Sequence, residues 1–427
     1  MKILWLTNIP LPEASFLMNE KPLPFGGWLV NASNDLSEND EIDLHIAFPF
    51  KGISGFKQME GKKINYYAFS PIETSQTSAS NQINLDKIIK KVNPDLVHIF
   101  GTEYAHSLAM VNLCNNIGTK TIVSIQGLTS IYSRHYMANL PIKIQKRFTI
   151  RDLIKRENLI VHQKKFEKRG ELEVETIKRT KHVIGRTTWD KACTSQINPE
   201  ATYHFCNETL REEFYKHMWG IDKCERFSIF TSQASYPIKG IHFVLEAMPL
   251  ILKKYPKAKL YIAGHDITKA DTLKQKIKLS SYAKYIRNLI KEYKLGESVN
   301  FTGLLDEKQM CERYLKSNVF VCPSSIENSP NSLGEAMILG VPCVASDVGG
   351  VSDMLRHKDE GFVYQTDAPY MLAHYVREIF ENEDLALKFS RNAREHALET
   401  HDRDENTTRL IEIYRDVLEK QVEKFEC

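Results

Sequence analysis

The chain has 427 residues, of which 42% are hydrophobic and 26% are charged, and its formal net charge is +3. This composition is typical of a soluble globular protein, and the length favours two domains that each bury a core of their own. The small net charge gives no support to nucleic-acid binding.

The first half of the sequence alternates short apolar strands with helical stretches. Because each crossover returns the chain to the same end of a sheet, this alternation is typical of a parallel, doubly wound α/β domain. Strands are predicted over residues 2–8, 42–48, 95–100 and 121–125, and helices over residues 85–92 and 105–117.

The same pattern begins again after a polar and irregular stretch over residues 206–226. We place the domain boundary near Asp222, which predicts an N-terminal domain over 1–222, a C-terminal domain over 223–398 and a final helical segment over 399–427. Two such sheets facing each other would hold ligands beyond the carboxyl ends of their strands, in the cleft between them. The second set of strands is predicted over residues 227–231, 259–263, 299–302, 319–322 and 341–346, with helices over residues 241–254, 282–293 and 307–316.

Two glutamates, Glu327 and Glu335, stand on either side of a predicted helix start, with seven residues between them. A short buried strand ends just before Glu327. Ser329 is a suitable N-cap and Pro330 a suitable first helical residue, so the helix is predicted over residues 330–339. Glu327 therefore lies in a loop at a strand end, and Glu335 lies inside the helix.

This helix start can bind an anion. The backbone N–H groups of Asn331, Ser332 and Leu333 have no partner within a helix and would point toward the loop, as in helix termini that bind diphosphates. A carboxylate accepts two hydrogen bonds from a vicinal diol, so Glu327 and Glu335 suit the two sugars on either side of a diphosphate. The alternative is a solvated loop glutamate and a charge on the helix face, which leaves the combination of cap, glycine stop and following strand unexplained.

With Gly303, Gly340, Gly349 and Gly350 around it, this segment resembles the retaining glycosyltransferases of family 4, which have a GT-B fold of two facing Rossmann-like domains and an E-x7-E motif. The resemblance covers the whole chain. It implies that the loop glutamate contacts the donor sugar and that the helix glutamate contacts the nucleotide ribose. It also implies a UDP- or GDP-linked sugar as donor, an acceptor-binding N-terminal domain, a nucleotide-binding C-terminal domain, and a final helix that crosses back onto the N-terminal domain.

The resemblance also indicates groups for the diphosphate. Lys239 ends the loop after the first strand of the second domain, where a fixed cation would neutralise the charge that develops on the departing phosphate. Gln233 lies in the same loop and is a donor-binding candidate. Gly26 and Gly27 lie in the first strand-to-helix loop, where the absence of a Cβ lets the backbone approach a phosphate or a sugar. A surface lysine and an ordinary turn are the alternatives.

Two positions depart from the family pattern. The family usually has an arginine shortly before the lysine, and residues 233–235 contain none. Gln126 stands where the family commonly has a histidine, and a glutamine forms hydrogen bonds but takes up no proton at neutral pH. A retaining front-face displacement needs no strong protein base, because the departing phosphate can take the proton of the acceptor. We therefore keep Gln126 as a catalytic candidate.

Polar residues around the strand at 95–100 are candidates for the acceptor side. Glu103, Tyr104 and His106 follow the strand and would lie at its carboxyl end. His98 lies within the apolar strand, so we expect it to be a core histidine with satisfied hydrogen bonds.

Two basic features have alternative interpretations. Arg186 either binds the phosphate or an anionic acceptor, or pairs with Asp190. Residues 134–169 contain eleven lysines and arginines against three acidic residues, interleaved with apolar ones. This stretch of the N-terminal domain either contacts an anionic membrane or a lipid diphosphate, or is a helical pair with solvated charges.

The sequence thus favours a retaining hexosyltransferase that uses no metal and no cofactor, acting on a saccharide or lipid-linked acceptor in surface polysaccharide synthesis. One alternative is a nucleotide-sugar epimerase or hydrolase of the same fold, which would need a pair of proton-transfer groups that Gln126 does not supply. Another is a non-catalytic nucleotide-binding partner of a second transferase. No apolar stretch approaches the roughly 20 residues of a membrane span, the N-terminus becomes polar too soon for a signal peptide, and the eight cysteines lack Cys-x-x-Cys spacing, so we expect a cytoplasmic protein with reduced thiols.

Overall fold

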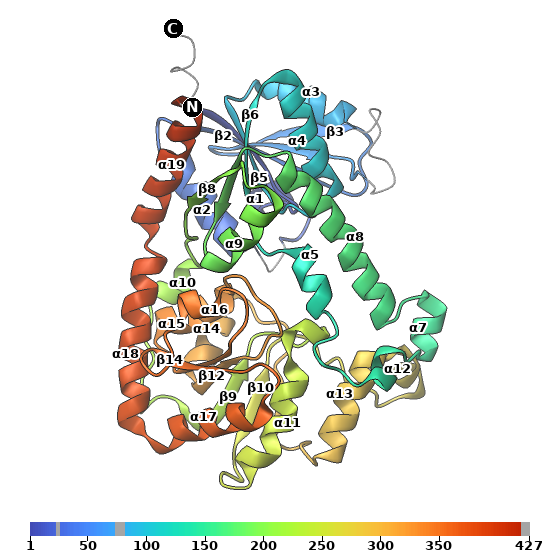
Figure 1. The fold of residues 1–427 in the computed structure, drawn as a ribbon, viewed down its shortest axis with the longest axis vertical. Coiled ribbons are helices and arrows are strands. Elements are labelled where there is room, and N and C mark those ends of the chain that lie inside the picture. Colours follow the sequence, from blue (N-terminus) through green and yellow to red (C-terminus); the bar gives the residue numbers. More distant parts are fainter. Residues whose placement is uncertain (23–25, 73–81, 420–427) are drawn as a thin grey trace. The chain divides into compact units, whose positions relative to one another are not determined.

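The computed structural model describes residues 1–22, 26–72 and 82–419 (Figure 1). Its internal contacts divide the chain into two units. The first unit contains Met1–Ser130, Lys168–Leu210 and His401–Cys427, and the second contains Ile131–Glu167 and Arg211–Thr400. Within the described ranges, no helix combines the length and the apolar composition needed to cross a lipid bilayer.

The first unit is built on an eight-stranded sheet in the order β3-β4-β2-β1-β5-β6-β7-β8. All neighbours are parallel except β3 and β4, which pair in antiparallel fashion. The four predicted strands are present as β1, β2, β5 and β6, and four others were missed because they are short or carry polar residues. The strands are β1 (Lys2–Leu6), β2 (Asp43–Pro49), β3 (Phe56–Glu60), β4 (Asn65–Phe69), β5 (Leu96–Phe100), β6 (Lys120–Ser124), β7 (His182–Gly185) and β8 (Thr202–Phe205).

Helices of the first unit connect and cover these strands. The final helix packs on this sheet, because Trp5 Nε1 of β1 donates to Tyr414 Oη at 2.9 Å and His98 Nδ1 of β5 lies 2.6 Å from the same oxygen. The helices are α1 (Pro12–Leu17), α2 (Gly27–Ser37), α3 (Ile83–Val92), α4 (Ala105–Ile117), α9 (Thr188–Ile197) and α19 (Arg403–Glu419), with the end of α8 (Leu159–Lys178) and the first half of α5 (Thr129–Tyr132) at the borders of the unit.

The second unit has a six-stranded parallel sheet in the order β11-β10-β9-β12-β13-β14. All five predicted strands are present, and β14 is additional. The strands are β9 (Glu225–Thr231), β10 (Lys259–Ile262), β11 (Val299–Phe301), β12 (Ser317–Cys322), β13 (Cys343–Ser346) and β14 (Gly361–Tyr364). The helices are α10 (Glu212–Tyr215), α11 (Ile241–Leu252), α12 (Leu273–Lys278), α13 (Ser281–Glu292), α14 (Glu307–Leu315), α15 (Asn331–Leu339), α16 (Val351–Met354), α17 (Pro369–Glu381) and α18 (Glu383–Thr400).

The segment Ile131–Glu167 corrects one sequence interpretation. We assigned this basic stretch to the N-terminal domain, but its contacts belong to the second unit. His242 Nε2 lies 2.8 Å from the carbonyl oxygen of Ala138, and the Ser281 N–H donates to Asp152 Oδ2 at 3.1 Å. Such contacts, between residues more than a hundred positions apart, leave no local signal in the sequence. The segment carries α6 (Ile142–Gln145), α7 (Ile150–Lys155) and the start of α8.

The borders of the two units also differ from the expected ones. The longer segment of the second unit begins at Arg211, whereas we placed the domain boundary near Asp222. The irregular stretch that suggested a linker is in fact attached to the second unit, because Trp219 donates its backbone N–H to Leu339 O at 2.7 Å and its Nε1 to Ser317 O at 2.8 Å.

Candidate functional site

The second unit brings Lys239 and Glu327 into contact. β9 and β12 are neighbours in a parallel sheet, so the loops that follow them leave from the same edge. Lys239 ends a short 3-10 helix after β9, and Glu327 lies in the loop after β12. Lys239 Nζ lies 2.6 Å from Glu327 Oε1. Two residues that the sequence suggested separately thus form one ion pair.

Glycines fix the backbone on both sides of this pair. Gly349 has a φ of +53°, and a Cβ there would lie 1.9 Å from the carbonyl oxygen of Glu327. The Gly350 N–H donates to that same oxygen at 3.2 Å. Gly240, with a φ of +68°, follows Lys239, and a Cβ there would lie 1.8 Å from Pro323 O. Both close approaches require glycine.

The surroundings keep Lys239 charged. Ser324 Oγ donates to Glu327 Oε1 at 2.8 Å, and only 10% of the Glu327 side chain is exposed. Burial alone would lower the pKa of Lys239, but the Glu327 carboxylate and Tyr236 raise it above its ordinary value. Lys239 and Ser324 both contact Oε1 of this carboxylate, and none of the described residues hydrogen-bonds to Oε2.

Tyr132 is a further residue beside this pair, and no motif in the sequence indicated it. It comes from the segment Ile131–Glu167. Burial is the largest cause that raises the pKa of the Tyr132 phenol, and the charge of Glu327 raises this pKa further. The charge of Lys239 opposes the shift. The segment therefore contributes a neutral phenol to the surroundings of the ion pair.

The helix start at α15 differs in detail from the prediction. The N-cap position is Pro330, without a side-chain cap, and Ser329 Oγ instead donates to Met354 Sδ at 3.5 Å. The Leu333 N–H is not available for an anion, because it donates to Pro330 O at 2.9 Å in a tight first turn. Among the described residues, the backbone N–H groups of Asn331 and Ser332 have no hydrogen-bond partner.

Glu335 is held by an arginine that the sequence reading missed. Arg211 Nε and Nη2 donate to the two carboxylate oxygens of Glu335 at 2.6 and 2.8 Å. Burial raises the pKa of Glu335, and Arg211 opposes this shift. Because each carboxylate oxygen accepts two hydrogen bonds, the fork of Arg211 leaves acceptor capacity on both oxygens. Arg211 lies in the stretch that was interpreted as an irregular connection.

The other donor-binding candidates occupy loops and a helix start. Gln233 is exposed in the loop after β9. Gly26 and Gly27 belong to the first unit, where Gly26 has a φ of +81° and stands at the N-cap of α2. The glycine pair therefore marks a helix start, as predicted. Its contact with a phosphate stays a prediction.

In the first unit, Gln126 and Arg186 meet on a glutamate that the sequence reading did not single out. Gln126 Nε2 donates to Glu208 Oε1 at 2.8 Å, and Arg186 Nη1 lies 2.6 Å from Glu208 Oε2. Arg186 Nη2 also donates to Gln126 O at 3.2 Å. The suggested pairing of the Arg186 side chain with Asp190 is wrong, because Asp190 Oδ2 accepts the Arg186 backbone N–H as part of the cap of α9.

Of the acceptor-side candidates, His106 is buried, whereas Glu103 and Tyr104 are half-buried. His106 is 5% exposed, and its ring stacks on Tyr104 with centroids 5.1 Å apart. Burial lowers the pKa of His106 to about 4, so the ring is neutral at pH 7. Tyr104 Oη accepts a hydrogen bond from Asn8, and burial raises the pKa of Glu103. His106 is thus a core residue.

His98 is a satisfied core histidine, as expected. Its ring nitrogens lie 2.6 Å from Tyr414 Oη and 2.7 Å from Ser124 Oγ. Burial lowers the pKa of His98 to about 3. A nearby cavity, lined by Trp5, Trp28 and Arg186 among others, has a volume of about 40 Å³. Small-molecule pockets begin at roughly 300 Å³, so this cavity is too small for a hexose.

Comparison with known proteins identifies the domain that carries the Lys239–Glu327 pair. Residues 212–396 match the family model described as "Glycosyl transferases group 1". This segment is similar to the glycosyl transferases of group 1. It includes Glu335 but begins one residue after Arg211.

Several curated relatives of this chain are named as glycosyltransferases. The chain is 28% identical over 214 residues to a putative glycosyltransferase, YtcC, of Bacillus subtilis, which covers 49% of this chain and 50% of the relative. It is 26% identical to the N-acetyl-alpha-D-glucosaminyl L-malate synthase of Bacillus anthracis, covering 51% of this chain and 54% of that protein. The chain thus spans about half the length of the curated relatives it matches.

Solved structures match the chain over nearly its whole length. Sucrose-phosphate synthase from Thermosynechococcus elongatus aligns with a TM-score of 0.71 at 15% identity, covering 98% of this chain and 99% of that one. Anabaena HepE in complex with UDP-glucose aligns with a TM-score of 0.67 at 15% identity, covering 97% and 100%. At these identities the likeness concerns the fold, which is GT-B, as predicted.

Proposed function

We propose that the chain is a retaining glycosyltransferase that moves a hexose from a nucleoside diphosphate sugar to a saccharide or lipid-linked acceptor in surface polysaccharide synthesis. The Lys239–Glu327 ion pair carries this proposal. It joins a fixed cation and a carboxylate at the strand ends of the segment that matches group 1. The start of α15 adds two backbone N–H groups that have no hydrogen-bond partner among the described residues.

Lys239 neutralises the diphosphate of the donor. Because Glu327 and the neighbouring tyrosines keep it protonated, its charge is in place before the donor binds. The N–H groups of Asn331 and Ser332 add two donors for the same anion. As the glycosidic bond breaks, negative charge grows on the phosphate oxygen, so this cation stabilises the transition state more than the bound donor.

Glu327 positions the hexose. Lys239 and Ser324 both contact Oε1, and Oε2 remains to accept hydrogen bonds from sugar hydroxyls. The bond between the anomeric carbon and the phosphate oxygen breaks, and its electron pair stays on the phosphate. The acceptor hydroxyl forms the new bond from the same face and passes its proton to the departing phosphate. This proton transfer needs no protein base, so it is compatible with a glutamine at position 126, where the family commonly has a histidine.

Glu335 binds the ribose of the nucleotide. Arg211 holds the carboxylate in one orientation, so the remaining lone pairs can accept hydrogen bonds from the two ribose hydroxyls. Anabaena HepE, which has this fold, has been solved in complex with UDP and with UDP-glucose, which supports a UDP-linked donor. The first unit then binds the acceptor, where Gln126, Arg186 and Glu208 form one polar network.

The stereochemistry of the product tests this function. We would incubate the protein with UDP-glucose, UDP-N-acetylglucosamine or GDP-mannose and an alkyl glycoside acceptor, and read the new anomeric configuration by NMR. The proposal predicts an α-linked product from an α-linked donor, formed equally well with EDTA present. A β-linked product would exclude retention, and loss of turnover in EDTA would exclude the metal-independent mechanism.

A further inference from the structure

Seven exposed apolar side chains gather on three short helices of the second unit and on the connection between two of them. Ile154 is 74% exposed, Leu153 is 62% exposed and Leu273 is 76% exposed. They share this surface with lysines and arginines, so the two kinds of side chain alternate along it. We call this surface the basic–apolar face, and define it by Ile142, Phe148, Ile150, Leu153, Ile154, Leu273 and Ile277 together with Lys143, Lys146, Arg147, Arg151, Lys155, Arg156, Lys274, Lys276 and Lys278.

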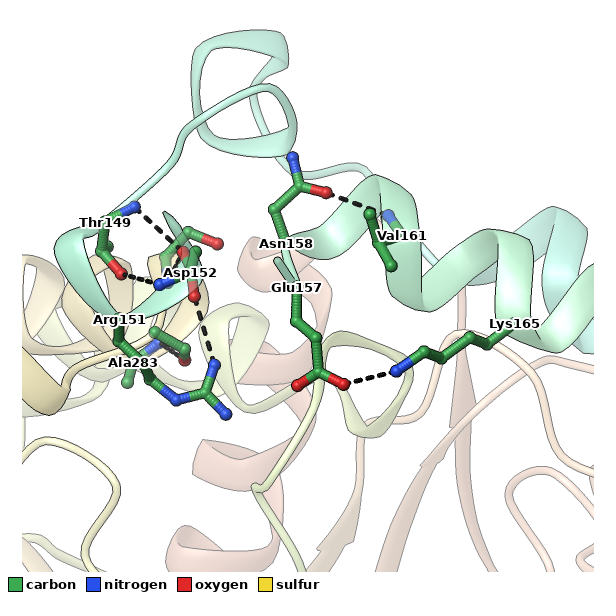
Figure 2. A network of polar contacts seen from close by, with 10 residues as sticks. Thr149, Arg151, Asp152, Glu157, Asn158, Val161, Lys165 and Ala283 are labelled. Atoms are coloured by element: carbon green, nitrogen blue, oxygen red, sulfur yellow. Dashed lines mark hydrogen bonds and ion pairs between the residues drawn. The ribbon is translucent and has the colours of Figure 1, made fainter. Parts of the chain in front are cut away.

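The apolar side of α7 faces solvent because its polar side is anchored. Asp152 is 1% exposed and closes a capping box with Thr149 (Figure 2). Its Oδ2 also accepts the backbone N–H of Ser281, at the start of α13. On a helix, residues at i, i+3 and i+4 share one side, so fixing Asp152 inward turns Ile150, Leu153 and Ile154 together to the outside. An ordinary surface helix has the opposite arrangement.

A second segment, more than a hundred residues later, continues the same face. α12 packs beside α7 (Figure 1). It begins with a capping box of Thr272 and Gln275, which fixes its first turn. Leu273 and Ile277 are four residues apart and therefore lie on one side of α12. Two elements that are distant in sequence thus present apolar side chains and lysines at one surface.

The charge of this face is largely uncompensated. Residues 142–156 and 273–278 contain nine lysines and arginines and one acidic residue, Asp152. Arg151 pairs with Asp152 at 3.2 Å. The other eight basic residues have no carboxylate within ion-pair distance among the described parts of the chain.

The neighbouring part of the basic stretch is built differently. In α8, Leu159 is buried, and the ring of Phe166 lies 5.0 Å from that of Tyr136. Lys165 pairs with Glu157 there (Figure 2). The exposed apolar character is therefore confined to α6, α7 and the connection between them, with α12 added. The sequence suggested the whole range 134–169 for contact with a membrane, and this range is wider than the exposed apolar surface.

We propose that the basic–apolar face docks on a lipid bilayer that carries anionic headgroups. Its apolar side chains enter the boundary between headgroups and acyl chains, and its lysines and arginines contact the phosphates. Short segments in which exposed apolar residues alternate with basic ones are typical of interfacial binding. Pairing of this face with a second copy would bring eight unpaired cations against eight others, which opposes a dimer.

Vesicle co-sedimentation tests this docking. Full-length protein is mixed with vesicles of phosphatidylcholine alone or of equal parts phosphatidylcholine and phosphatidylglycerol. We expect binding to the anionic vesicles, and weaker binding at high salt because the headgroup attraction is screened. The double variant Leu153→Ser/Ile154→Ser should lower the bound fraction by on the order of tenfold or more, because two apolar side chains no longer enter the bilayer.

Matched variants separate this face from the general surface. Leu387→Ser, at an exposed leucine of α18, and Lys257→Glu should leave binding unchanged, whereas Lys155→Glu/Lys274→Glu should abolish it. Circular dichroism and melting temperature confirm that each variant is folded. Absence of binding to anionic vesicles would overturn the proposal. So would equal losses in the control variants, or a wild-type dimer in solution that Leu153→Ser/Ile154→Ser dissociates.

Discussion

Lys239 Nζ lies 2.6 Å from Glu327 Oε1, although the two residues are 88 positions apart in the chain. The contact exists because β9 and β12 are adjacent parallel strands whose following loops leave from one edge of the sheet. Gly240, after β9, and Gly349, after β13, allow their loops to approach the backbone of the loop that carries Glu327. The proposed function depends on this pair more than on any other contact.

Glu327→Gln should abolish glycosyl transfer while leaving the fold intact. Glutamine keeps the shape and one acceptor oxygen, but it removes the negative charge that orients Lys239 and one acceptor site for the sugar. The measurement is turnover of the best donor, with the melting temperature as a control for folding. Wild-type turnover by this variant would show that Glu327 is not part of the reaction site.

The pair should also contribute to stability, and a double-mutant cycle measures how much. Lys239→Met or Glu327→Leu alone leaves a largely buried charge without its partner, which should lower the free energy of unfolding by roughly 1–3 kcal/mol. The double variant should lose less than the sum of the two single losses. Chemical denaturation of the four proteins gives the coupling, and additive losses would contradict a direct interaction.

Gly349→Ala should disturb the site through the backbone. An added Cβ would lie 1.9 Å from Glu327 O, and the φ of +53° disfavours any side chain. We expect at least about 1 kcal/mol of destabilisation together with a loss of transfer. Gly296→Ala is the matched control in the same unit, because nothing lies within 4 Å of a Cβ there. Similar behaviour of the two variants would contradict this prediction.

Stability should fall in mild acid because of buried neutral histidines. Burial lowers the pKa of His106 to about 4, below its ordinary value of 6.5. The stabilisation is therefore complete above pH 6.5 and is lost as the pH falls toward 4, with a slope of up to about 1.4 kcal/mol per pH unit for this histidine. His98 and His242 have lowered pKa values for the same reason.

His106→Phe isolates this contribution. The ring stacks on Tyr104, and Nε2 has no hydrogen-bond partner among the described residues, so phenylalanine should fit. The loss of unfolding free energy between pH 7 and pH 5 should be smaller than in the wild type. Exposed His374, replaced by asparagine, is the control and should not change the slope. An unchanged slope in His106→Phe would contradict the assignment.

Much of the fold could be predicted from the sequence. Short apolar strands alternate with helices in both halves, and nine of the strands appear where this pattern placed them. Glu327 could be found because it follows a strand and precedes a helix start. β7 and the edge strand β8 have four residues each, which is too short for a clear periodic signal.

The partners of the site residues could not be predicted. Arg211 contacts Glu335 across 124 positions, and Arg186 contacts Glu208 although a closer aspartate was available. Tyr132 reaches the surroundings of Glu327 only because its segment belongs to the second unit. Each of these contacts depends on tertiary packing, and none follows from local spacing or residue type.

Nucleotide binding by the Arg211–Glu335 pair and Lys239 tests the central claim most directly. Thermal unfolding of the wild-type protein is followed with UDP, GDP, ADP or CMP, because a ligand that binds only the native state raises the melting temperature. We predict that one diphosphate raises it, that Glu335→Ala and Lys239→Met remove this increase, and that Gly296→Ala keeps it. If no nucleotide raised the melting temperature of the wild type, a nucleotide-sugar site at this position would be contradicted. The same would follow if Glu335→Ala and Lys239→Met showed the same increase as the wild type.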